Sequence, residues 1–355
     1  MSPEPMQPAP RIPPAPGGPR PLWSVMIPAY KPTRRYLSQT VESVLLQAPE
    51  PDQMQIAIID DHSQEDTARL VAQAANGRVE YYEQGAHTGM ASNWNQAVTL
   101  ARGEWVHLLH QDDLVLPGYY AKLQTAIEAH PELGAAYTQH YLIDGEGRAK
   151  GLMSDNPAKE AGVVQDWLRH VFVALSFQTP AIVVRRRVYE QLGGFRGDFR
   201  YALDWDMWKR LAASYPIWFE PEALACYRRH ADGASIGFFA TGENMAEVRR
   251  SIEVSRDYLP AGQREAMAVA ARAHYRESAV DTAINALFTM RNPAMAKRQF
   301  SEARRFGGGG FAALVTGRFL AAIQRWLRYE VLRRPQPDGL AGAFKQFWFE
   351  GRSAK

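Results

Sequence analysis

The sequence predicts an α/β protein: a largely parallel sheet covered by helices, followed by a helical C-terminal extension. Strand-like apolar runs alternate with amphipathic helical patterns over the first 110 residues. Such alternation implies right-handed crossovers between parallel strands, and it places ligands at the carboxyl ends of those strands. Beyond Ser235 the chain is helical and Ala-rich, with breaks at Pro260, Pro293 and the four-glycine run 307–310. Its 355 residues suffice for one large domain with an appendage.

The first half contains four predicted strands and three predicted helices. The strands cover residues 23–27, 56–59, 79–82 and 105–109. One face of the first helix carries Leu37, Val41, Val44 and Leu45, and one face of the third carries Trp94, Ala97, Val98 and Ala101. Ser63, three residues before Asp66, is expected to cap the second helix, which continues to about Ala75.

The pattern is looser in the second half. Strands are predicted near 135–138 and 181–184, around Ile217, and over 223–228. A turn is expected at 144–147, and a helix begins near Trp205. These elements would close the domain that starts near Leu22.

Residues 1–21 differ in composition from everything that follows. They hold nine of the 23 prolines, and proline removes backbone donors and cannot continue a helix. We therefore expect a disordered, proline-rich leader over 1–21, a folded domain over 22–235 and a helical extension over 236–355.

Composition and charge exclude several classes of protein. Cys226 is the only cysteine, so a disulfide or a multi-thiolate zinc site cannot form within the chain, and a cytoplasmic location is expected. No apolar run reaches about 18 residues and no signal-peptide core is present, so we expect neither a membrane span nor secretion. Residues 301–355 hold ten Lys/Arg and four Asp/Glu, so the net charge of +3 comes from this tail. No nucleic-acid reading motif accompanies it, and we expect no nucleic-acid partner.

Acidic pairs follow two of the predicted strands. Asp112 and Asp113 come after the fourth strand, where adjacent carboxylates need a divalent cation or ample water. A metal site and a solvated turn or helix cap both meet this need. Asp60 and Asp61 follow the second strand, and one of them could bind a nucleobase or ribose, or cap a helix. Tyr30, after the first strand, could stack on a base or cover the sheet edge.

Two further candidate groups lie in the second half. Asp204 stands at the start of a predicted helix, where it could cap that helix or accept a proton from a hydroxyl nucleophile. The run 227–230, Tyr-Arg-Arg-His, ends a predicted strand. His230 could supply a nitrogen ligand to a metal beside an arginine that neutralises phosphate, or it could be an ordinary surface histidine.

Five segments occur in an order that resembles the family 2 glycosyltransferases of GT-A fold. They are 24–30 (Ser-Val-Met-Ile-Pro-Ala-Tyr), 42–47 (Glu-Ser-Val-Leu-Leu-Gln), 58–63 (Ile-Ile-Asp-Asp-His-Ser), 102–105 (Arg-Gly-Glu-Trp) and 111–113 (Gln-Asp-Asp). Five motifs in order are far more specific than any one of them. The resemblance covers roughly residues 22–235 and implies a GT-A type Rossmann-like sheet in a catalytic domain.

The resemblance also implies a role for each matched residue. It implies that the donor nucleotide is bound by Pro28, Ala29, Tyr30, Asp61 and Asp112. It implies a divalent metal, manganese or magnesium, held by Asp113 and His230, and a catalytic base at Asp204. Two positions depart from the family's pattern, because Leu203 replaces a Glu and His110 replaces the first Asp of an Asp-x-Asp motif.

The implied reaction is an inverting transfer of a sugar from a nucleoside-diphosphate sugar to a hydroxyl of a glycan or lipid-linked acceptor, in surface polysaccharide synthesis. Two alternatives stay open. One is a non-catalytic relative that binds nucleotide sugar or glycan. The other is a nucleotide-binding oxidoreductase, although no Gly-rich fingerprint follows the first strand.

A basic amphipathic helix is predicted over residues 311–334. One side carries Phe319, Ile323, Trp326, Leu327 and Val331, and the other carries mainly Arg318, Arg325 and Arg328. The apolar side could lie among lipid headgroups, which would put the protein peripherally on the inner membrane face. Alternatively, it could pack on the catalytic domain or on a second subunit.

Overall fold

The computed structural model describes residues 6–332, except 16, 65, 154–157 and 231–232. Its strands are β1 Trp23–Ala29, β2 Met54–Asp60, β3 Glu80–Glu83, β4 Trp105–Leu108, β5 Leu114–Val115, β6 Ala135–Asp144, β7 Ala149–Leu152, β8 Gly162–Val163, β9 Ile182–Arg185 and β10 Ile217–Arg229. They form one sheet in the order β3-β2-β1-β4-β9-β6-β10-β5, with β7 beside β6 and β8 beside β10.

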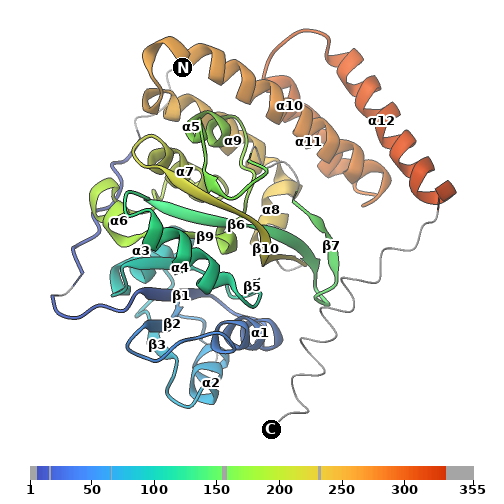
Figure 1. Ribbon diagram of the computed structural model, residues 1–355. Coiled ribbons are helices and arrows are strands. Elements are labelled where there is room, and N and C mark those ends of the chain that lie inside the picture. The colour runs from blue at the N-terminus through green and yellow to red at the C-terminus, as the bar shows by residue number, and fades with distance from the viewer. Residues whose placement is uncertain (1–5, 16, 65, 154–157, 231–232, 333–355) are drawn as a thin grey trace.

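Helices cover both faces of this sheet (Figure 1). They are α1 Arg34–Leu45, α2 Thr67–Ala74, α3 Met90–Leu100, α4 Tyr119–Ala129, α5 Trp167–Val173, α6 Arg186–Leu192, α7 Leu203–Ala212, α8 Ala234–Thr241, α9 Glu243–Val254, α10 Arg264–Phe288, α11 Pro293–Arg305 and α12 Phe311–Leu332. Short 3-10 turns lie at Thr179–Ala181, Ser255–Tyr258 and Ala261–Gln263. The predicted α/β class and the helical C-terminal region are confirmed.

The first half of the sheet is parallel, as the alternation of elements predicts. β1 pairs in parallel with β2 and with β4, and β2 pairs in parallel with β3. Every residue of β1, β2 and β4 is buried, because helices cover both of their faces. The register sets Ala29 opposite Asp60. Tyr30 and Asp61 therefore emerge side by side at the carboxyl edge of the sheet.

The second half is mixed. β9 runs antiparallel to both β4 and β6, whereas β10 runs parallel to β6. The two strands predicted around Ile217 and over 223–228 form the single strand β10, whose pairing is irregular between Glu220 and Ala225. This irregularity explains why the sequence pattern breaks within one strand.

Ser63 does not cap α2, so this prediction is wrong. The N-cap position is Asp66, which makes no side-chain cap bond. The Ser63 hydroxyl instead donates to the Asp60 carboxylate, which also accepts a bond from the Tyr81 hydroxyl at 2.9 Å. Asp60 is buried, and a buried carboxylate needs such donors more than an exposed helix end does.

The described part of the proline-rich leader is ordered, in contrast to the expected disorder. This N-terminal strap, residues 6–15, inserts Ile12 into the main apolar core, where it is 2% exposed. The Pro10 carbonyl accepts a bond from the Gly194 amide at 2.7 Å, and the Pro13 carbonyl accepts one from the Arg186 guanidinium at 3.1 Å. Prolines lack a donor but keep their carbonyls, which fix the strap here. Residues 1–5 and 16 lie outside the described part.

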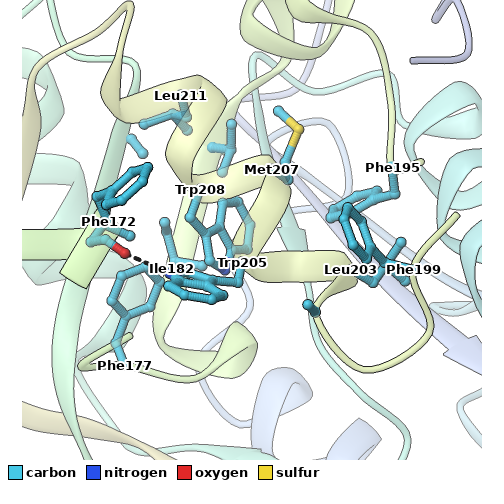
Figure 2. Packing of buried hydrophobic residues seen from close by; sticks show 14 of the residues in the cluster. Phe172, Phe177, Ile182, Phe195, Phe199, Leu203, Trp205, Met207, Trp208 and Leu211 are labelled. Atoms are coloured by element: carbon cyan, nitrogen blue, oxygen red, sulfur yellow. Dashed lines mark hydrogen bonds between the residues drawn. The ribbon is translucent and has the colours of Figure 1, made fainter. Parts of the chain in front are cut away.

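One buried apolar cluster joins the sheet to the C-terminal helices. Figure 2 shows Trp205 and Trp208 of α7 packed among Phe172 and Phe177, with the Trp205 indole donating to the Val171 carbonyl. The same cluster includes residues of α9, α10 and α11 and the residue that follows α11: Val248, Ile252, Ala268, Ala271, Val280, Ile284, Ala303 and Phe306. No break in the core therefore marks the expected boundary at residue 235.

α12 packs along α10 through the part of its apolar side that the structure describes. Phe319 contacts Phe288 with ring centres 5.2 Å apart, and Arg318 forms ion pairs with Glu277 and Asp281. These contacts favour packing on the protein for this stretch, while Ile323 stays partly exposed. The remaining predicted residues lie outside the described side chains: Arg325, Trp326, Leu327, Arg328, Val331 and residues 333–334. Within the described ranges, no helix has the length and apolar content of a membrane span.

Candidate active site

A pocket of about 220 Å³ opens where β1 and β4 end. We name it the strand-end pocket; it is lined by Tyr30, Lys31, Thr33, Tyr36, Gln111, Asp112 and His230. Three of the predicted site residues, Tyr30, Asp112 and His230, therefore meet in one place. Lys31 was not predicted, and its only signal in the sequence was its position after Tyr30. Its ammonium lies 5.3 Å from the Tyr30 ring centre and supplies a cation suited to phosphate.

Gln111 fixes Tyr30 in the wall of this pocket. The Tyr30 amide donates to Gln111 Oε1 at 2.9 Å, and Gln111 Nε2 donates to the Tyr30 carbonyl at 3.2 Å. This two-point bond joins the end of β1 to the loop after β4. Tyr30 remains 38% exposed, although the His87 ring stacks on it with centres 4.0 Å apart.

Pro28 and Ala29 lie within β1 and are buried in the sheet. The Ala29 carbonyl accepts bonds from the Asp61 amide at 2.8 Å and from the Asn93 side chain at 3.3 Å. Their side chains do not face the strand-end pocket. What they supply is the end of the strand from which Tyr30 projects.

The structure pairs His230 with Asp112 and not with Asp113. His230 Nε2 lies 2.8 Å from Asp112 Oδ2 at the pocket wall. Asp113 is fully buried, and its Oδ1 accepts a bond from the Arg228 amide at 2.8 Å. Burial raises the pKa of Asp113. The two acids thus differ in exposure, with Asp112 facing the pocket and Asp113 beneath it.

Arg228 holds this acidic loop against the rest of the domain. Its guanidinium donates to the Asp112 carbonyl at 2.7 Å and to the Gln39 side chain at 2.9 Å, and it lies 4.6 Å from the Tyr36 ring centre. Arg228 is buried and positions the loop, whereas the neighbouring Arg229 is exposed.

Asp61 is enclosed by the loop between β3 and α3. Its carboxylate accepts bonds from the Thr88 amide and hydroxyl and from the Gly89 amide, each at 2.8 Å, and from Gln84 at 3.2 Å. The His87 Nδ1 lies 2.8 Å from its Oδ2. A carboxylate has about four lone-pair sites, so Asp61 is fully used by the protein and only 1% exposed.

Asp204 occupies the first turn of α7, apart from the strand-end pocket. Its Oδ1 accepts a bond from the Trp205 amide at 2.7 Å, and its Oδ2 accepts one from the Thr179 hydroxyl at 3.3 Å. Burial raises the pKa of Asp204 despite these donors. A carboxylate with a raised pKa is a stronger base, which suits proton abstraction.

His110 contacts the buried carboxylate of Asp113. Its Nδ1 is 3.5 Å from Asp113 Oδ2, and its ring packs on Trp94 with centres 4.7 Å apart. Burial alone would lower its pKa, but the Asp113 carboxylate outweighs this, with smaller contributions from Asp112 and Asp204, and raises the pKa. The residue that replaces the expected first Asp therefore faces the Asp113 carboxylate, which favours its protonated form.

Glu247, on α9, is a supporting residue that sequence reasoning missed. Its carboxylate accepts bonds from the amides of Arg200 at 2.9 Å, Tyr201 at 2.7 Å and Ala202 at 3.0 Å, directly before α7 begins. Leu203, where the family's pattern has Glu, is buried in the apolar core. A carboxylate thus supports the start of α7, but it comes from 44 residues further along the chain than Leu203. No local pattern could reveal it.

Comparison with known proteins finds a family match for part of the chain. Residues 24–193 match the family described as Glycosyl transferase family 2. Chondroitin synthase of Escherichia coli is 28% identical over 220 residues, which are 61% of this chain and 30% of that protein. The O-antigen biosynthesis protein RfbC of Myxococcus xanthus is 24% identical over 250 residues, 66% of this chain and 19% of that protein. The chain thus spans less than a third of either relative.

Solved structures share the fold. Staphylococcus aureus TarS 1–349 in complex with UDP-GlcNAc has a TM-score of 0.58 at 15% identity, covering 86% of this chain and 91% of that one. The mannosyltransferase PcManGT of Pyrobaculum calidifontis, in complex with GDP-Man and Mn2+, has a TM-score of 0.55 at 18% identity, covering 97% and 91%. The motifs, the sheet and the matched segment agree: residues 24–193 match glycosyltransferase family 2, and the chain shares its fold with these GT-A glycosyltransferase structures.

Proposed function

We propose that this protein is an inverting glycosyltransferase that moves a sugar from a nucleoside-diphosphate sugar to a hydroxyl acceptor. The observation that carries the proposal is the strand-end pocket, where Tyr30, Lys31 and the Asp112–His230 pair face one space. An aromatic ring, a cation and a carboxylate beside an imidazole match the base, the phosphates and the metal of such a donor. The nucleotide sugars bound by TarS and PcManGT support the same class of donor.

The residues present fit a divalent metal whose coordination is completed by phosphate oxygens of the bound donor. Asp112 offers carboxylate oxygen and His230 offers imidazole nitrogen, a set that suits manganese. Within the described residues, no group of three or more His, Cys, Asp or Glu could hold the ion alone. Magnesium and manganese at diphosphates are commonly bound by one or two side chains plus phosphate oxygens. Asp112 and His230 would hold the ion, which would neutralise the departing diphosphate, with buried Asp113 supporting them.

Asp204 is proposed as the base. It would accept the proton of the acceptor hydroxyl as that oxygen attacks the anomeric carbon on the face opposite the diphosphate. The raised pKa of Asp204 and its bonds to Thr179 and Trp205, which orient the carboxylate, support this role. A single displacement requires no covalent sugar intermediate and inverts the anomeric centre.

We propose a glycan or lipid-linked acceptor and a role in surface polysaccharide synthesis. The names of the relatives, a chondroitin synthase and an O-antigen biosynthesis protein, support this. A cytoplasmic site of action remains a prediction from the single cysteine, Cys226. Peripheral membrane contact through 311–334 would now rest on the exposed part of α12, because Phe319 packs on Phe288.

A donor panel tests the proposal. UDP- and GDP-sugars should raise the melting temperature in the presence of Mn2+ and less in its absence, since a ligand selective for the native state stabilises it. The active donor should then release free nucleoside diphosphate when acceptor sugars are added. Binding without any release would favour the non-catalytic alternative, which the replacements at His110 and Leu203 keep open. Absence of binding by every donor would reject the proposal.

A further inference from the structure

The imidazole of His87 makes two contacts that a bound nucleobase would need. Its ring stacks on Tyr30 with centres 4.0 Å apart and planes 22° from parallel. Its Nδ1 lies 2.8 Å from Asp61 Oδ2. The recorded hydrogen bond of Nδ1 is to the Asp61 backbone carbonyl at 3.3 Å. Stacking on an aromatic face with polar groups at the ring edge is how proteins bind a flat heterocycle.

These contacts use the two groups that the family resemblance assigns to the donor nucleotide, Tyr30 and Asp61. Only one ring can occupy a given face of Tyr30. Four donors bond to the Asp61 carboxylate in this state, and the His87 Nδ1 also lies beside it, 2.8 Å from Oδ2. The other donors to Asp61 are backbone amides or side chains held in the loop Gln84 to Gly89. His87 is the donor whose ring could be replaced by a base without dismantling that loop.

The strand-end pocket is too small for a nucleotide sugar as it stands. Its volume is about 220 Å³, whereas ligand pockets usually measure roughly 300–1,000 Å³. His87 does not line the pocket, but it stacks on the lining residue Tyr30, so its displacement would add room beside that ring. The His87 side chain is 49% exposed and sits on a surface loop, so it can turn away into solvent.

We propose that His87 occupies the nucleobase position in the ligand-free protein and is displaced when the donor binds. This inference rests on the proposed function, and it makes His87 a gate that competes with the base. Removing the ring should strengthen nucleotide binding, because the base no longer has to displace a ring stacked on Tyr30. The other four bonds to Asp61 keep the loop in place in such a variant.

Calorimetric titration of the full chain with UDP and GDP in the presence of Mn2+ tests the gate. His87→Ala should lower the Kd of at least one of the two nucleotides about three- to tenfold, the range expected for losing one stacked pair. Its Kd for inorganic pyrophosphate, which has no base, should match that of the wild type. His87→Phe keeps a ring that can stack and should bind no more tightly than the wild type. His130→Ala removes another histidine that packs on an aromatic, Trp218 at 4.9 Å, outside the pocket, and should change nothing.

Two outcomes contradict the gate and are distinguishable from failure of the proposed function. If His87→Ala binds UDP and GDP as well as the wild type or more weakly, His87 does not compete with the base, although the donor site stands. An equal gain for pyrophosphate would mean that the variant opens the phosphate site instead, which also overturns the gate. If neither nucleotide binds the wild type or the variant, the proposed function fails and the gate fails with it.

Discussion

The strand-end pocket and the surroundings of Asp204 are built by different means. The pocket is a polar arrangement in which Tyr30 is tied to Gln111 and Asp112 is tied to His230 at strand ends. Asp204 instead starts a helix embedded in aromatic packing, with Trp205 against Tyr275 of α10 at 4.9 Å. The segment that matches the family, 24–193, includes most of the pocket, but it ends before Asp204 and His230.

This difference teaches that the C-terminal helices hold α7, the helix that carries the proposed base Asp204. The amide of Leu175 donates to the Tyr275 hydroxyl at 3.3 Å, and Lys209 on α7 donates to Ser251 on α9 at 2.7 Å. Glu247 on the same helix holds the turn before α7. The proposed donor side is thus held mainly by loops within the matched segment, while the proposed base is held by helices beyond it.

The substitution Asp204→Asn is the strongest test of whether the strand-end pocket and the proposed base act separately. If Asp204 acts only in chemistry, kcat should fall by about two to four orders of magnitude, while the Kd for UDP or GDP stays within about twofold because the pocket is untouched. Asp257→Asn, whose side chain is 83% exposed in the parent, is the matched control and should keep full activity. A nucleotide affinity that falls together with kcat would show that the two regions are not separate.

His230→Ala should affect the opposite property, the dependence of nucleotide binding on Mn2+. Loss of even an outer partner of a metal costs about 10- to 100-fold in metal affinity, so loss of a proposed ligand should cost at least as much. Titration of Mn2+ against protein saturated with UDP or GDP measures this, and Asp112→Asn should behave alike. An unchanged Mn2+ titration in both variants would show that Asp112 and His230 do not bind the metal.

Glu247→Ala probes the helical support of Asp204. It removes an acceptor shared by three backbone amides, so the free energy of unfolding should fall by about 1–3 kcal/mol. We also expect kcat to fall more than nucleotide affinity, since α7 carries Asp204. Glu243→Ala, an exposed acid on the same helix, is the control for denaturant unfolding and kinetics. If the two variants had equal stability and equal kcat, Glu247 would not support the start of α7.

Lys209→Met should have the smallest effect, because packing holds this side of the molecule. Burial lowers the pKa of Lys209 well below 10.5, so the unfolded chain binds a proton that the folded chain binds less readily. The difference in proton binding destabilises the folded state, and this destabilisation decreases as pH rises toward 10.5. The variant should be more stable than the wild type by about 1 kcal/mol at pH 7, with the advantage shrinking at alkaline pH. A growing advantage in urea titrations at higher pH would contradict this sign.

The sequence predicted most of the parallel half because each element there has its own local signal. Apolar runs end at Tyr30, Asp61 and Asp112, and the alternation of elements fixes which strand ends are neighbours. Two of those three residues do lie on the pocket. The enclosure of Asp61 could not be predicted, since it depends on how the loop from Gln84 to Gly89 folds back over the strand end.

Support from distant parts of the chain escaped sequence reasoning for the same reason. Glu247 looks like one more exposed acid on a helix, and Tyr275 looks like a core residue of α10. Their relation to Asp204 arises only when α9 and α10 pack on α7. The strap over residues 6–15 is a similar case, because its prolines suggested mobility while Ile12 inserts into the core.

The strap has a practical consequence for how this protein is prepared. A recombinant version trimmed to begin at Leu22 would look sensible from composition, yet it would withdraw Ile12 from its slot and leave the Arg186 guanidinium without the Pro13 carbonyl. The exposed apolar surface would promote aggregation during purification. Expression plasmids should therefore retain the proline-rich beginning, and affinity tags are better joined ahead of it.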